Sequence, residues 1–83
     1  MRLETFDQIN VHEQCWLPMF VLYFDPKDFP GKYVVRLFDI DQPTHNFTVS
    51  DSEEAAIETI PRECRARLNR REDDQPHIVA VFL

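Results

Sequence analysis

The chain has 83 residues, of which 43% are hydrophobic and 12% aromatic. This length fits one globular domain and excludes a second. Nine basic against fifteen acidic residues give a net charge of −6, which disfavours non-specific binding to DNA or to anionic membranes. The longest strongly apolar stretch, residues 16–24, is far shorter than the ~20 residues that span a bilayer. We therefore expect no membrane partner.

The first residues, MRLETFDQ, carry charges where a signal peptide would need a hydrophobic run. We therefore expect a cytoplasmic protein in a reducing compartment. In such a compartment Cys15 and Cys64 are predicted to be two free thiols rather than a disulfide.

The predicted elements begin after an irregular N-terminal arm, residues 1–14, where no capping signal or sustained period is present. Residues 15–24 are continuously apolar, which predicts a strand packed on both faces. A loop with two prolines and the single glycine follows, and residues 32–40, KYVVRLFDI, form the next strand. The connection is too short for a crossover, so the two strands should be antiparallel.

The second half of the chain is predicted to add a strand, a helix and a closing strand. Residues 46–50 alternate, with Phe47 and Val49 expected to point inward. The helix should begin at Ser50 or Asp51, with a glutamate completing a capping box, and end near Pro61. Residues 62–72 are compatible with a second short helix. Residues 78–83 are uniformly apolar, which favours a strand inside the sheet.

Residues 15–83 are therefore predicted to form a single α+β domain. It contains a small antiparallel sheet of about four strands, in the order β-β-β-α-β, with one main helix on one face. One short helix cannot cover both faces of such a sheet. The uncovered face should be apolar and must be covered by the N-terminal arm, a second copy of the chain or a different protein.

The leading functional prediction is a small non-enzymatic interaction or regulatory module that binds a protein partner or itself through this apolar face. The aromatic residues of the predicted strands are the candidates for the contact, without an assignment of which of them share the exposed face. They are Trp16, Phe20, Tyr23, Tyr33 and Phe38.

The alternative prediction is nucleic-acid binding through an arginine-rich segment, residues 62–71. Arginine suits bidentate contacts to phosphate. Neighbouring acidic residues offer a structural explanation instead, because they can neutralise the same side chains. The five arginines are Arg62, Arg65, Arg67, Arg70 and Arg71.

Catalytic and cofactor signatures are weak. A single glycine excludes a glycine-rich phosphate loop, and we expect no enzyme activity and no cofactor. Four residues, His12, Cys15, Cys64 and His77, offer zinc ligands. The spacing of the last two matches no closed zinc motif, so buried cysteines and surface histidines are the preferred interpretation and no metal site is predicted.

A further pattern runs through the chain as KYVVRLFD, then PT, DSEEA, IP, RARLNR and DDQPHIVAVFL. This succession resembles a family of short uncharacterised bacterial and phage-borne proteins, and it covers about residues 18–83. The resemblance implies a compact α+β domain. It implies no catalytic residue.

Overall fold

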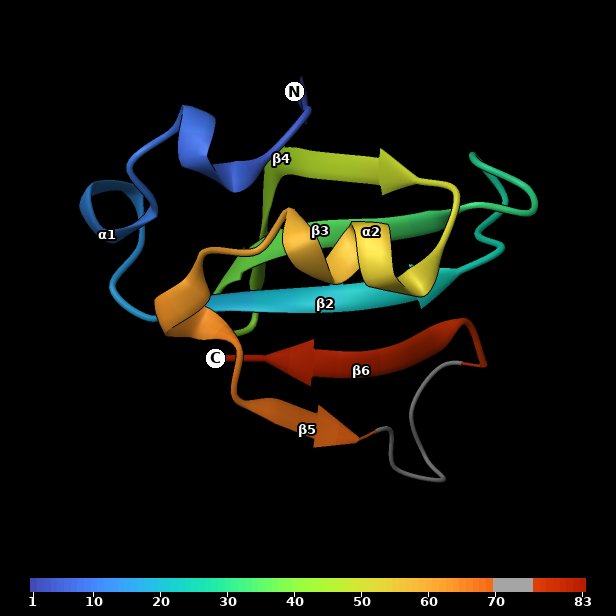
Figure 1. The fold of residues 1–83 in the computed structure, drawn as a ribbon. Helices are drawn as coiled ribbons and strands as arrows, with labels where there is room; N and C mark the ends of the chain where they lie inside the picture. Colours follow the sequence, from blue (N-terminus) through green and yellow to red (C-terminus); the bar gives the residue numbers. More distant parts are fainter. Residues whose placement is uncertain (70–75) are drawn as a thin grey trace.

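The structure is a computed structural model that describes residues 1–69 and 76–83. Within these residues one mixed sheet has six strands in the spatial order β1-β4-β3-β2-β6-β5 (Figure 1). The strands are β1 (Arg2–Leu3), β2 (Pro18–Phe24), β3 (Tyr33–Asp39), β4 (Gln42–Ser50), β5 (Arg67–Asn69) and β6 (Ile78–Phe82). The short helices are α1 (Val11–Gln14) and α2 (Glu53–Glu58), with 3-10 turns η1 (Phe6–Gln8) and η2 (Arg62–Cys64).

The centre of the sheet agrees with the prediction from the sequence. Strands β2 and β3 are antiparallel, with Phe20 opposite Leu37 and Leu22 opposite Val35. Strand β6 lies between β2 and β5, so its uniform apolarity correctly predicted an internal strand. The α+β class is confirmed, but the prediction of about four antiparallel strands is wrong. The two additional strands lie at the edges, and β1 is parallel to β4.

The N-terminal residues 1–14 are part of the folded core rather than an irregular arm. Leu3, Phe6 and Val11 are buried. The ring of Phe6 meets that of Phe20 edge to face, with centroids 4.9 Å apart, and the Phe6 amide donates to the Thr59 carbonyl at 2.9 Å. This segment therefore packs on the same side of the sheet as α2.

Helix α2 lies across one face of the sheet, in front of β3 and β2 in Figure 1. Its N-cap is Ser52, whose side chain accepts from the Ala55 amide at 3.1 Å. The predicted caps, Ser50 and Asp51, are therefore one or two residues too early. Ala56 and Ile60 bury the apolar stripe against the sheet.

The predicted helix over residues 62–72 is wrong where the structure describes it. The chain forms only the turn η2 and then joins the sheet as β5, with Arg67 opposite Phe82. The amide of Leu83 and the carbonyl of Ala66 pair beside it at 3.1 Å. The free edge of β6 offers these backbone groups more partners than an isolated short helix would.

The side chains of β4 point in the opposite directions to those expected. Thr48, not Phe47 or Val49, is buried on the helix side, where its hydroxyl lies 2.9 Å from that of Thr59. A threonine can face the core here because the hydroxyl pair satisfies both polar groups. Phe47 and Val49 consequently lie on the other face of the sheet.

No helix in residues 1–69 and 76–83 has the length and apolar character needed to cross a membrane.

Candidate functional site

The face of the sheet turned away from α2 is largely apolar, and we call it the open face. Its members alternate along each strand with residues of the core cluster, according to the strand register. No helix covers it in the part of the chain that the structure describes. The open face consists of Met19, Val21, Tyr23, Val34, Arg36, Phe38, Phe47, Val49, Leu68 and Val81.

One end of the open face is covered by the loop between β2 and β3. Phe29 of this loop packs on Phe47, with ring centroids 5.6 Å apart. Asp28 accepts a charged hydrogen bond from Arg36 at 2.6 Å. The guanidinium of Arg36 also lies over the Phe47 ring, 5.2 Å from its centroid. Arg36 is therefore paired with an acidic side chain of the same chain.

The other end of the open face, where β2 begins and β3 ends, is exposed. Met19 and Phe38 stand opposite each other there and are half-buried. Leu17 and Ile40 continue the two strands and are 50% and 54% exposed. Leu68 of β5 is 52% exposed beside Val81. By register Leu68 lies in the row of Val21 and Arg36, not in that of Met19 and Phe38. Exposed or half-buried apolar side chains therefore lie both at this end and on the edge strand β5, and several of them are aliphatic.

Ile40 has an unusual backbone conformation at this end. Its φ is 59°, a left-handed value that is rare for a β-branched residue. Its amide donates to the Leu17 carbonyl at 3.0 Å, and the Leu17 amide donates to Asp39 at 3.1 Å. These bonds hold Ile40 outward, where a glycine or asparagine would be the ordinary choice. Such strained residues are frequent at functional surfaces.

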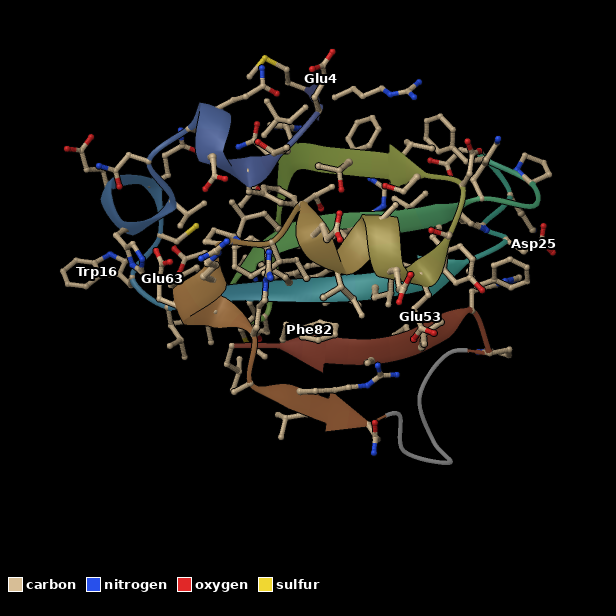
Figure 2. The ribbon with its side chains drawn as sticks, viewed as in Figure 1. Glu4, Trp16, Asp25, Glu53, Glu63 and Phe82 are labelled. Carbon is tan, nitrogen blue, oxygen red and sulfur yellow. The ribbon has the colours of Figure 1, made fainter. Side chains whose placement is uncertain are left out.

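Trp16 precedes β2 and is 93% exposed. Figure 2 shows its ring pointing away from the domain, and Leu17 follows it directly in the chain. A tryptophan that stands in water buries a large apolar area when a partner covers it, and tryptophan is enriched among residues that dominate binding energy. Trp16 therefore extends the candidate surface beyond the end of the sheet.

The five aromatic residues predicted to bind a partner do not share one face. Tyr23 and Phe38 lie on the open face, and Trp16 lies at its end. Burial raises the pKa of Tyr23, and nearby Arg36 opposes the shift more weakly. Phe20 is fully buried under the helix side, and Tyr33 packs against that same core. Phe20 and Tyr33 therefore have no access to a partner on the open face.

The aliphatic members of the candidate site were missed, because the prediction considered aromatic side chains. Met19 lies opposite Phe38 in the antiparallel pairing of β2 and β3. Since Phe38 was already a candidate, this pairing could have identified Met19 as its neighbour on the same face. Leu68 was assigned to a helix and Ile40 to the end of a strand. The exposure of Leu68 depends on the position of a sheet edge, and that of Ile40 on the turn between β3 and β4. The apolar pattern of the sequence defines neither position.

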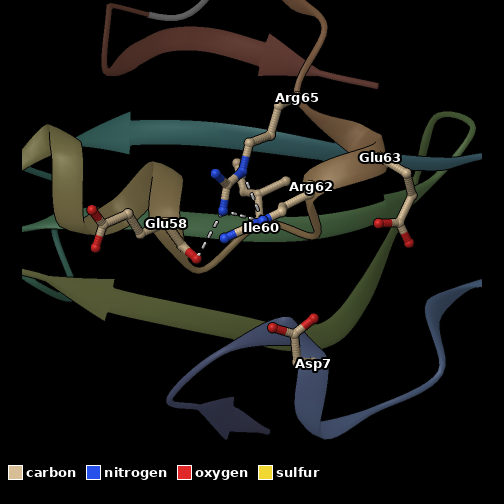
Figure 3. A pocket seen from close by; sticks show the side chains of 6 residues that line it. All are labelled: Asp7, Glu58, Ile60, Arg62, Glu63 and Arg65. Atoms are coloured by element: carbon tan, nitrogen blue, oxygen red, sulfur yellow. Dashed lines mark hydrogen bonds between the residues drawn. The ribbon is translucent and has the colours of Figure 1, made fainter.

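The described arginines of segment 62–71 are largely engaged within the chain. Arg65 donates to the Ile60 carbonyl at 3.1 and 2.9 Å and to that of Glu58 at 3.2 Å, so it caps the C-terminal end of α2 (Figure 3). Arg67 pairs with Glu53 at 3.1 Å. Arg62 is exposed, while Arg70 and Arg71 lie outside the described residues. The nucleic-acid alternative stays a prediction and gains no support from these contacts.

A shallow polar hollow lies between η1 and the end of α2. It is lined by Asp7, Glu58, Ile60, Arg62, Glu63 and Arg65 (Figure 3). The carboxylate of Glu63 points away from Arg62 and Arg65 in this view. The guanidinium of Arg65 already donates to the carbonyls of Glu58 and Ile60. The hollow is therefore lined by acidic and basic side chains whose charges partly cancel. It offers little apolar surface for a small organic ligand.

Both cysteines are free and buried in the core. Burial raises the pKa of each thiol, and Asp39 near Cys15 and Glu63 near Cys64 raise it further. Thiols in such surroundings stay protonated at neutral pH and are poor nucleophiles.

The four residues that offer zinc ligands in the sequence do not converge as a set. His77 precedes β6 and lies beside the C-terminal end of β2, with its ring nitrogen 3.2 Å from the Phe24 carbonyl oxygen. His12 instead lies beside Glu63 and Cys64, and the three ligand atoms are all within 4.8 Å of one another. Glu63 was not among the candidate ligands considered from the sequence.

Comparison with models of known families, with curated proteins and with solved structures found no match for this chain. The resemblance to short bacterial and phage-borne proteins therefore stays a prediction.

Proposed function

We propose that this protein is a non-enzymatic interaction module that binds another protein chain through the exposed end of the open face. The observation that carries the proposal is the number of apolar side chains that are exposed or half-buried on the open face and at its end, namely Met19, Phe38, Leu17, Ile40 and Leu68. Contiguous exposed apolar surface on a small domain marks interaction sites. The opposite face is already occupied by α2 and residues 1–14, so binding there would require unfolding.

The dimensions of the domain fit an interface of ordinary size. Its two larger extents are 30 and 25 Å, and a standard interface buries ~800 Å² of each partner. An interface of that size extends from the exposed end onto the loop that covers the rest of the open face. Arg36 on the open face is already paired with Asp28, so an apolar and uncharged partner surface is the complement.

A second copy of the same chain meets this requirement. The net charge of −6 opposes association in general, and Asp39 and Asp41 flank Ile40 at the exposed end, so the apolar contacts of the interface must outweigh this repulsion. Within residues 1–69 and 76–83 the edge strands β1 and β5 have two and three residues, which is short for extended edge-to-edge pairing. Face-to-face stacking of two sheets, about 10 Å apart, is the expected arrangement.

The proposal is tested by sedimentation velocity of the purified protein from micromolar to millimolar concentration. Leu68→Asp and Phe38→Asp place a charge on the open face, and Leu68 is exposed enough for its variant to keep its fold. Ala55→Asp is the matched control, because Ala55 is exposed on α2. Circular dichroism establishes that each variant is folded.

We expect the wild type and Ala55→Asp to dimerise and both open-face variants to sediment as folded monomers. A wild type that stays monomeric at millimolar concentration overturns the second copy as partner. A different protein that binds the wild type and Ala55→Asp but not Leu68→Asp would keep the open face as the binding surface. Open-face variants that associate as the wild type does overturn the proposal altogether.

A further inference from the structure

His12, Glu63 and Cys64 bring three different metal-ligating groups together from two distant parts of the chain. His12 belongs to α1 and the other two to η2. The His12 Nε2 and Glu63 Oε1 atoms are 3.3 Å apart. All three ligand atoms lie within 4.8 Å of one another, a grouping identified among residues 1–69 and 76–83.

We infer that this cluster binds one zinc ion, or a closely similar divalent transition metal. Zinc bonds measure about 2.0 Å to nitrogen or oxygen and about 2.3 Å to sulfur, so two ligands of a tetrahedral ion stand roughly 3.3–3.6 Å apart. The separation of His12 and Glu63 already equals one such edge. The sulfur must approach by up to roughly 1.2–1.5 Å, the difference between the 4.8 Å limit and such an edge, and rotation of the side chains supplies this approach.

Buried residues and local hydrogen bonds fix the backbone at two of the ligands, His12 and Cys64. Val11 is buried beside His12 and anchors α1, and Asn10 caps that turn by accepting from the Glu13 amide at 3.3 Å. Cys64 is 4% exposed, and its amide donates to the Pro61 carbonyl at 2.9 Å. The ligands therefore project from rigid turns rather than from free loops, which limits the ordering that metal binding requires.

The metal can reach the cluster from solvent. His12 and Glu63 are both exposed, and a shallow hollow lined by these two residues opens to the surface. Cys64 supplies the third ligand from the core side. On binding, its S–H proton passes to solvent and the thiolate bonds to zinc, because a coordinated thiol is deprotonated.

Three protein ligands leave the fourth tetrahedral position to water. The bound ion would join the N-terminal segment to η2 across 51 positions of the chain. Its expected role is to stabilise the attachment of residues 1–14. The site is independent of the open face, so either proposal can fail alone.

The test is titration of the reduced, full-length protein with CoCl₂, followed by displacement with ZnCl₂. Cobalt in a tetrahedral site with a thiolate ligand gives strong visible bands and a near-ultraviolet charge-transfer band. We expect one cobalt per chain with these bands, and a zinc-dependent rise in the unfolding temperature.

Three variants remove one ligand each: His12→Ala, Glu63→Gln and Cys64→Ser. For His12→Ala, which changes an exposed side chain and should keep the fold, we expect the affinity to fall by more than about 100-fold. That exceeds the ~10–100-fold cost of losing an outer-shell partner. Cys15→Ser and His77→Ala are the matched controls and should bind as the wild type does.

A wild type that takes up no cobalt or zinc overturns the inference. So does binding that survives His12→Ala with unchanged affinity, or binding that is lost in Cys15→Ser or His77→Ala when those variants are folded. A metal-dependent stabilisation that is absent in folded His12→Ala supports it.

Discussion

The two faces of the sheet are formed by the same strands but have different surroundings. On the helix side, Phe20 and Leu37 are fully buried under α2 and the N-terminal segment. On the open face, Met19 and Phe38, their neighbours in sequence, are only half-buried. One face therefore supplies most of the folding energy, while the other retains apolar surface that a partner can cover.

The open face itself has two ends. The loop between β2 and β3 covers one end through Phe29 and the Asp28–Arg36 ion pair. The other end exposes Leu17 and Ile40, and Leu68 is exposed on the edge strand β5. The chain thus covers part of its second face by itself, and the uncovered part is confined to this end and to β5. This confinement gives an interaction surface a defined place on an otherwise acidic molecule.

The largest expected change in the free energy of unfolding comes from removing an aromatic ring on the helix side of the sheet. Phe20→Ala should lower the free energy of unfolding by about 3–5 kcal/mol, because it leaves a cavity against Phe6. Met19→Ala, one position away on the half-exposed face, should cost about 1 kcal/mol. Urea denaturation at low protein concentration measures both. Equal costs would contradict the distinction between the faces.

The next effect concerns the buried hydroxyl pair that joins α2 to β4. Thr59 donates to the Ala56 carbonyl at 2.6 Å, so Thr48 must donate to Thr59 across 2.9 Å. Thr59→Val leaves the Thr48 hydroxyl unpartnered in the core and should cost about 2 kcal/mol, against about 1 kcal/mol for Thr48→Val. Chemical denaturation of the two single variants decides the order. The reverse order would show that the donor is assigned wrongly.

A smaller effect is expected at the covered end of the open face. Asp28→Asn removes an ion pair with Arg36 that is partly exposed, so the loss of unfolding free energy should be below about 1 kcal/mol and should shrink with added salt. The same denaturation series at low and high salt measures it. A loss that does not change with salt would contradict an electrostatic contribution of this ion pair.

The smallest expected effect is the contribution of Asp51 to the pH dependence of the unfolding free energy. The hydrogen bond and charge of Lys32 hold the pKa of this carboxyl below its ordinary value. A lowered folded-state pKa stabilises the fold above the ordinary carboxyl pKa of about 4, and this contribution is lost as the pH falls through the folded value. Lys32→Met should remove that part of the acid dependence in thermal melts at graded pH. An unchanged acid profile would contradict the pairing.

Much of the fold could be predicted from local patterns. Prolines and the single glycine separate β2 from β3, and the acidic start of α2 marks the helix within two residues. Strands β1 and β5 could not be predicted, because two or three residues are too few to display a period. They exist because the neighbouring strands β4 and β6 offer unpaired backbone groups.

The candidate site was less predictable than the fold. In β2 and β3 both faces are apolar, so alternation has no polar side that identifies the exposed face. Phe20 and Tyr23 are therefore indistinguishable by pattern, although one is core and the other is on the open face. In β4 the polar Thr48 misled the assignment, because its buried partner Thr59 comes from a distant segment.

Nuclear magnetic resonance of the protein labelled with ¹³C at the methionine methyl groups tests the central claim most directly. The chain has two methionines, Met1 and Met19, of which Met19 lies on the open face. As the protein concentration rises from micromolar to millimolar, the Met19 methyl signal should shift or broaden while that of Met1 stays unchanged. A Met19 signal that does not respond, or a Met1 signal that responds alone, would contradict self-association through the open face.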